Sequence, residues 1–280
     1  MQTLCWLLWL TGAYPLGQAW WANRRTTLFH TLCWAFLSWV AWGLALGTAN
    51  RWPAPAQTAA GYLALCVTGC AGIAVLGARW PGVRAWNFVV VALLAVELLP
   101  VAEGIATGTR LQLSSVRIVY VAAALCVGFL NYLPTRFCPA ALTLLLGCGI
   151  NLAVLLVPVQ SDLPAQQYLA LGNVVVAAVP WLAYGSLVGG KPPLSEFDRL
   201  WHDFRNRYGF VWGQRLRDQF NRSAAHAGWP VVLRWQGLRL KGGEDLPQPG
   251  THDAILATLQ ALMKRFTHEE ENSSGSRKER

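Results

Sequence analysis

The first 190 residues lack lysine altogether and hold only eight arginines and three acidic residues. Charged residues are therefore 11 of 190 in that part, or about 6 %, whereas a typical water-soluble domain has about 25 %. In residues 191–280, by contrast, 26 of 90 residues are charged. This division excludes one soluble globule, a collagen-like chain and a disordered chain. It predicts an all-α polytopic membrane bundle over residues 1–190, followed by a soluble tail.

The cysteines do not form the pattern of a disulfide framework, because their number is seven and all lie in or beside apolar segments. We expect them to be reduced packing residues. Cys66 and Cys70 share one helix face, but two thiolates rarely hold a metal ion, and the chain has only two methionines. The sequence therefore predicts no metal site and no cofactor.

Several membrane chemistries lack their required residues. His30 is the only histidine before residue 202, which excludes a bis-histidine haem, and no lysine lies in the last apolar segment to hold retinal. The run from Gly185 to Lys191 has phosphate-loop spacing, but Pro192 follows in place of serine or threonine. We predict no catalytic residues, and a membrane enzyme of unrecognised type stays an alternative.

Apolar segments of about 20 residues predict membrane-spanning helices. We identify about seven, and a count of six or eight is also compatible with the pattern. The first is the weakest, because Pro15 and Gln18 interrupt it. The predicted spans are 3–21, 28–48, 60–78, 83–106, 116–133, 139–159 and 167–188.

The basic residues predict the orientation, since cytoplasmic loops carry the excess of arginine and lysine. With seven spans and the tail inside, five arginines lie in cytoplasmic loops and three in outer loops, and the tail adds 15 basic residues. We therefore expect the N-terminus outside the cell and the C-terminus in the cytoplasm, with the lipid bilayer as the first partner.

Tryptophans support the membrane assignment, because several lie at span ends, where indoles collect at the headgroup level. A second group lies deeper in the first two spans, and consists of Trp6, Trp9, Trp34, Trp39 and Trp42. We interpret this group as packing and lipid contact, with a tryptophan-lined ligand groove as the alternative.

Ionisable residues at membrane depth are functional candidates, because they are costly there. Glu97 lies past the midplane of the fourth predicted span, and Glu103 lies close to the outer surface. We expect Glu97 to pair with Arg117, either as a structural ion pair or in a proton- or cation-coupled step. Pro100 is expected to kink the helix between the two acids.

Single amides in four predicted spans form a further candidate set, namely Asn87, Asn131, Asn151 and Asn173. Such side chains commonly form hydrogen bonds between helices. We prefer this packing role, and the alternative is that they line a polar cavity.

Residues 191–266 predict a small cytoplasmic α or α/β domain. Ser195 is suited to cap a helix whose apolar positions recur every three or four residues, and Gly209 is a plausible stop before a second helix. The aromatic stripe consists of Phe197, Trp201, Phe204, Tyr208 and Trp212, while Arg205, Arg207 and Arg215 project elsewhere. The stripe either packs as the core of a unit docked on the bundle or faces anionic lipid or a protein partner. Acidic residues interleave with the basic ones, so we expect no nucleic acid.

After Pro230 the residues alternate as in a strand or a short hairpin, and Thr251 is suited to begin a last helix. Residues 267–280 are polar and predict a disordered tail.

The function hypothesis that follows is a non-enzymatic membrane scaffold or sensor whose tail binds a partner. The main alternative is a small-molecule or ion transporter that uses Glu97 and the span amides.

Overall fold

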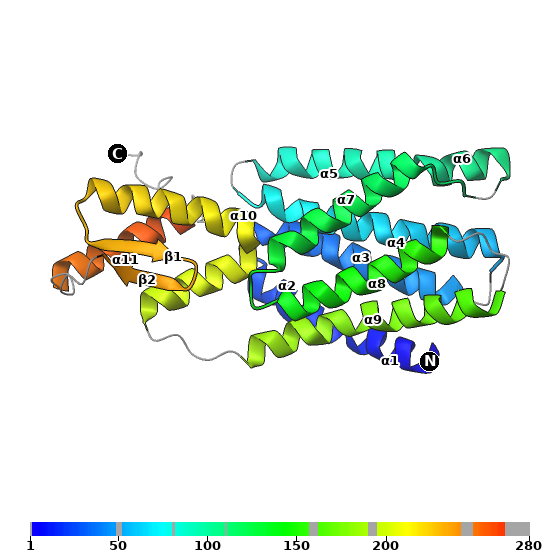
Figure 1. Cartoon of the computed structure of the whole chain (residues 1–280), viewed down its shortest axis with the longest axis horizontal. Helices are drawn as coiled ribbons and strands as arrows, with labels where there is room; N and C mark the ends of the chain where they lie inside the picture. Colours follow the sequence, from blue (N-terminus) through cyan, green and yellow to red (C-terminus); the bar gives the residue numbers. More distant parts are fainter. Residues whose placement is uncertain are drawn as a thin grey trace, which may run out of the picture.

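The computed structural model of the chain describes residues 2–48, 52–79, 82–109, 111–156, 162–189, 195–241 and 249–266. Figure 1 shows a long bundle of helices that run side by side, with a small mixed domain at one end. The predicted disordered segment, 267–280, lies outside the described residues.

Long apolar helices make up the bundle. Six are long and apolar enough to cross a membrane, with mean hydropathy from 1.4 to 2.2 over their most apolar windows. They are α3 (Leu28–Thr48), α4 (Ala54–Ala74) with its short extension η1 (Val75–Gly77), α5 (Val83–Glu97) continued by α6 (Leu99–Thr107), α7 (Ser115–Tyr132), α8 (Cys138–Leu156) and α9 (Asp162–Val188). This is the architecture of a multi-pass membrane protein.

The first predicted span, 3–21, does not form one long helix. It consists of α1 (Gln2–Thr11) and α2 (Ala13–Asn23), which are 10 and 11 residues long. The break follows from the sequence, because Gly12 is a poor helix former and Pro15 cannot donate its backbone bond in the next turn. Six helices rather than seven therefore have spanning length among the described residues.

The outer surface of the bundle is apolar. Phe88, Ile105 and Val116 are each more than three-quarters exposed, and many leucines and valines lie beside them. A water-soluble protein rarely exposes a continuous apolar surface of this extent, whereas a lipid-facing surface requires one.

The C-terminal domain is built from one bent helix, a hairpin and a last helix. These are α10 (Glu196–His226), β1 (Val231–Arg234), β2 (Gly237–Leu240), α11 (Pro249–Met263) and the short helix η2 (Lys264–Phe266). The strands pair antiparallel, with Val231 opposite Leu240 and Arg234 opposite Gly237. The connecting turn is therefore Trp235-Gln236.

The predicted aromatic stripe is the core of this domain. Phe197, Trp201, Phe204, Tyr208 and Trp212 are at most 5 % exposed and pack with Val231, Leu233, Ile255, Leu259 and Phe266. The interpretation of this stripe as a lipid or partner face is therefore wrong. The hairpin and α11 supply the apolar cover that the helix needs, and this cover could not be located from the helix pattern alone.

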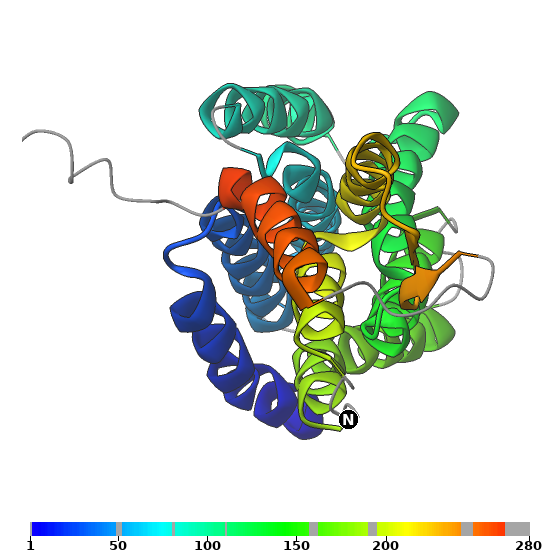
Figure 2. The same ribbon diagram turned by 90° about the vertical axis from the view of Figure 1, so that its left-hand side faces the viewer.

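The domain docks on one end of the bundle, against the turns that precede α3, follow η1 and join α7 to α8 (Figures 1 and 2). The backbone N–H of Thr27 donates to the carbonyl oxygen of Phe266 at 3.1 Å. The indole N–H of Trp212 donates to the carbonyl oxygen of Val75 at 3.0 Å. Because these bonds join buried groups of both units, the contact is continuous with the interior of each.

The bend in α10 lies at Gly209 and is held by a side chain of the bundle. Gly209 has φ 78° and ψ −165°, which interrupts the helix where the sequence predicts a stop. Across the gap, the Asn131 amide donates to the carbonyl oxygen of Tyr208 at 3.3 Å and accepts from the N–H of Val211 at 2.9 Å. The carboxamide thus replaces helix hydrogen bonds that the bend removes.

Candidate ligand cavity

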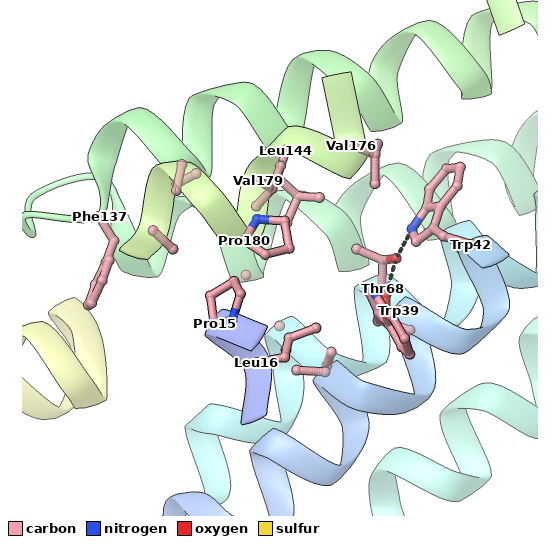
Figure 3. Close-up of a pocket in the computed structure, with 18 of the residues that line it drawn as sticks. Pro15, Leu16, Trp39, Trp42, Thr68, Phe137, Leu144, Val176, Val179 and Pro180 are labelled. Atoms are coloured by element: carbon pink, nitrogen blue, oxygen red, sulfur yellow. Dashed lines mark hydrogen bonds between the residues drawn. The ribbon is translucent and has the colours of Figure 1, made fainter. Parts of the chain in front are cut away.

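A cavity of about 400 Å³ lies inside the bundle (Figure 3). Its lining comes from α1 and α2 together with α3, α4, α7, α8 and α9. On α9 the lining extends from Asn173 to Leu187, about 21 Å along a helix at about 1.5 Å per residue. The described lining residues include no acidic or basic side chain. A volume in the range of about 300–1,000 Å³ with an apolar lining is typical of a site for a small molecule.

The two short N-terminal helices form one wall of this cavity. Figure 2 shows them as an outer arm beside α3 and α9, and Pro15 and Leu16 of α2 face the space in Figure 3. The arm covers one side of this space, which is still partly open to the outside, since the lining residue Leu187 is exposed.

A pair of tryptophans fastens the arm to α3. The rings of Trp9 and Trp39 stack with centroids 4.3 Å apart. Each indole N–H also donates to the backbone oxygen of the other residue, at 2.9 Å and 3.2 Å. Gly43 leaves the space for the Trp9 ring, because a Cβ there would overlap it.

The opposite edge of the arm is held by α9. The indole N–H of Trp181 donates to the hydroxyl of Thr11 at 3.2 Å, and the ring of Tyr14 lies against that of Trp181. The break at Gly12 faces Pro180, the proline inside α9. The break between α1 and α2 therefore lies against a proline of α9, which runs as one helix from Asp162 to Val188.

The deep part of the cavity carries a small polar cluster, formed by Ser38, Thr68 and Trp42. The Trp42 indole N–H donates to the Thr68 hydroxyl oxygen at 3.0 Å (dashed in Figure 3). Ser38 Oγ and Thr68 Oγ1 lie 2.7 Å apart, and the Thr68 hydroxyl reaches the carbonyl oxygen of Ala64 at 2.6 Å. Otherwise the walls are mostly alanine, leucine, valine and aromatic side chains.

The cavity wall is linked directly to the C-terminal domain through Tyr132. Its ring lines the cavity, and its hydroxyl donates to the carbonyl oxygen of Arg207 in α10 at 3.0 Å. Arg207 lies two residues before the bend at Gly209. A displacement of this wall would therefore reach the bend in α10 through one hydrogen bond.

Glu97 lies outside the cavity lining, at the break between α5 and α6. It is 2 % exposed, and its backbone oxygen accepts from the hydroxyl of Tyr62 at 2.8 Å. One side-chain oxygen contacts the thiol of Cys70 at 3.7 Å, and the other has no hydrogen-bond partner among the described residues.

The predicted pairing of Glu97 with Arg117 is wrong, because Arg117 forms two hydrogen bonds of 2.9 and 3.0 Å with Glu103 instead. The break at Leu98 precedes Pro100 and separates Glu97 from the outer end of the helix, where Glu103 is exposed and Arg117 is partly exposed. A straight-helix projection could not show this.

Only one of the four predicted amides lines the cavity, and this is Asn173. Asn87 accepts from the indole of Trp34 at 3.2 Å, and Asn151 donates to the carbonyl oxygen of Gly147 at 2.8 Å. Asn131 holds the bend in α10. Asn87 and Asn131 therefore bond to other helices, as the preferred interpretation states, whereas the hydrogen bond that Asn151 donates stays within α8.

The arginines of the C-terminal domain do not act as one exposed face. Arg205 is half-buried, donates to the backbone oxygen of Trp235 and lies over that residue's ring. Burial lowers the pKa of Arg205, and the nearby charge of Arg136 lowers this pKa further. Arg207 pairs with Asp203 at 2.7 Å, and Arg215 lies over the ring of Trp212.

No protein-family model, curated protein or solved structure matches the chain. The cavity itself is therefore the basis for assigning a function. Three of the five deep tryptophans, Trp9, Trp39 and Trp42, line it, so the tryptophan-lined groove was the sequence signal that pointed to this site.

Proposed function

We propose that the chain is a membrane-embedded sensor, in which the bundle binds an apolar molecule and the docked C-terminal domain responds to its presence. The observation that carries this proposal is the cavity of about 400 Å³, whose described lining has no charged side chain. One of its wall residues, Tyr132, forms a hydrogen bond with the backbone of α10. Apolar walls favour a hydrophobic ligand, because burying its surface contributes about 25 cal/mol per Å².

The same features give less support to an ion or polar-solute transporter. Glu97 and three of the four amides lie outside the cavity, so the groups that the transporter hypothesis needs are not gathered at one site. An ion would lose its hydration in an apolar space without charged partners, which is unfavourable.

We also propose that the C-terminal domain lies in the cytoplasm and can contact anionic lipid or a protein partner there. The bundle end that carries this domain also holds Arg24, Arg25, Arg79, Arg84 and Arg136 in or beside its turns. An excess of arginine on one side favours that side as the cytoplasmic one.

Photolabelling of the full chain in lipid nanodiscs tests ligand binding. The probe is a sixteen-carbon alkane that carries a diazirine near the chain middle, and the labelled residues are mapped by mass spectrometry. We expect saturable labelling of the cavity walls on α3, α4 and α9, and competition by unlabelled alkane.

Two variants and a control decide whether the labelled site is the cavity. Ala35→Phe and Ala141→Phe each place a large ring in the lining and should remove the saturable labelling. Ala95→Phe is the matched control, because Ala95 is exposed on the outer face of α5. Labelling that stays on outward residues such as Phe88 and ignores both cavity variants would overturn ligand binding at this site.

The response of the C-terminal domain is measured by hydrogen exchange of α10 with and without the bound alkane. Tyr132→Phe removes only the hydroxyl and should uncouple the C-terminal domain from ligand binding. The alkane would then still bind, but the hydrogen exchange of residues 204–212 would no longer change on binding. A ligand effect of equal size in the wild type and in Tyr132→Phe would refute the sensor link.

A further inference from the structure

The deep polar cluster of the cavity has a hydrogen-bonding direction that can be worked out from its partners. Thr68 has one hydroxyl proton, and this proton is engaged by the carbonyl oxygen of Ala64 at 2.6 Å. The indole of Trp42 has only a donor to offer, so at 3.0 Å it must donate to the Thr68 oxygen.

In the 2.7 Å contact between Ser38 Oγ and Thr68 Oγ1, Ser38 must then be the donor. Because the Thr68 proton is in use, Ser38 donates its own proton to the Thr68 oxygen. Ser38 Oγ therefore has no free proton and keeps lone pairs that can accept a hydrogen bond. Since Ser38 lines the cavity, its hydroxyl offers an acceptor in a lining that is mostly apolar.

A second side chain of the lining also has unused hydrogen-bonding capacity. Asn173 lies on α9, and its side-chain oxygen has no partner among the described residues.

The lining disfavours two classes of ligand. A carboxylate or phosphate would find no cation in the described lining, and a pure hydrocarbon would leave the Ser38 acceptor unused.

We infer that the ligand of the cavity is an apolar alcohol, a long-chain or polycyclic molecule whose single hydroxyl donates a hydrogen bond to Ser38 Oγ. This inference rests on the proposed binding function and names its ligand class. Ser38 lies ten residues into α3, about 15 Å from the bundle end. The ligand hydroxyl therefore lies near the middle of a hydrocarbon core of about 30 Å.

This placement distinguishes the ligand from ordinary bilayer lipids. A phospholipid keeps its headgroup at the surface and would bring only a chain end to Ser38. Fatty acids also differ, because without a cation in the described lining their carboxylate would have to take up a proton before binding, which costs free energy near neutral pH.

The test compares three competitors against the diazirine alkane on the full chain in nanodiscs. These are hexadecan-1-ol, its methyl ether, which lacks the donor proton, and hexadecane. One hydrogen bond contributes about 0.5–1.5 kcal/mol net, so we expect the alcohol to compete about 2- to 12-fold better than the ether.

Ser38→Ala should reduce this preference to about onefold while hexadecane competes as before. Ser186→Ala is the matched control, because its hydroxyl bonds within α9 and lies outside the cavity lining. The comparison of alcohol with ether uses the unaltered chain, so the inference stays testable even if Ser38→Ala fails to fold.

The outcomes separate the two proposals. Saturable alkane binding with equal competition by alcohol and ether would overturn the alcohol assignment and leave the binding function standing. A lack of saturable binding by any of the three compounds would overturn both.

Discussion

The bend of α10 at Gly209 gives the sharpest test of how the C-terminal domain is held. Replacing Gly209 by alanine acts in two ways. At φ 78° and ψ −165°, any L-residue is strained, by about 1–3 kcal/mol. The new Cβ would also overlap the Asn131 amide, which would have to move and lose its bonds to Tyr208 and Val211.

The two lost bonds add about 0.5–1.5 kcal/mol each, so the total cost is about 2–6 kcal/mol. We expect α10 to open locally more often, which is measured by hydrogen exchange of residues 204–216 in the full chain. A cost of 2 kcal/mol corresponds to exchange about 30-fold faster. Gly185→Ala is the control, because it meets nothing within 4 Å and lies in an ordinary helix.

A double variant separates the steric part from the backbone part. Asn131→Ala alone should cost about 1–3 kcal/mol, because it leaves buried backbone groups unpaired. In Gly209→Ala with Asn131→Ala the overlap with the Asn131 side chain is gone and only the close contact with the Asn131 backbone oxygen remains, so the combined cost should be smaller than the sum of the single costs. Two results would refute this account of the bend. One is a hydrogen-exchange rate of residues 204–216 in Gly209→Ala within threefold of the wild type. The other is a free-energy cost in the double variant that equals the sum of the two single costs.

Two further pairs of substitutions test the interior of the bundle. Gly72→Ala should lower stability by about 1–3 kcal/mol in thermal unfolding, because its Cβ would lie 2.6 Å from Gly128 Cα of the neighbouring helix. Gly61→Ala, with open space around it, should be neutral or gain up to about 1 kcal/mol, and equal effects of both would contradict the close contact of α4 with α7. Glu97→Gln should fold with unchanged or higher thermal stability, because it keeps the shape and removes an ionisable group that has no cation partner among the described residues. A clear loss of stability, with the conservative Glu97→Asp tolerated, would instead show that the acid itself is needed.

Much of the architecture follows from local sequence properties. The low charge of residues 1–190 and the long apolar segments predict a membrane helical bundle, because a helix is the only open segment that satisfies its own backbone in lipid. The six long helices and the small C-terminal region with its two-stranded sheet agree with this. The interruption of the first span by Pro15 and the kink near Pro100 are also local effects, since proline removes a donor wherever it lies.

The candidate site could be anticipated only in part. Trp39 and Trp42 suggested a groove as an alternative to packing, but periodicity cannot show whether a buried side chain meets a neighbour or an empty space. The partners of Glu97 and Arg117 depended on how α5 and α6 meet α7, and a helix break changed the facing residues.

What the sequence by itself determined is the division of the chain into an apolar bundle and a charged C-terminal domain, because hydropathy and charge are properties of single segments. Only the tertiary structure decided that the aromatic stripe is a core, that Asn131 fills the gap at Gly209, and that a cavity lies behind the N-terminal arm. Each of these depends on side chains far apart in the chain that are brought together by helix packing, and no local pattern encodes which of them meet.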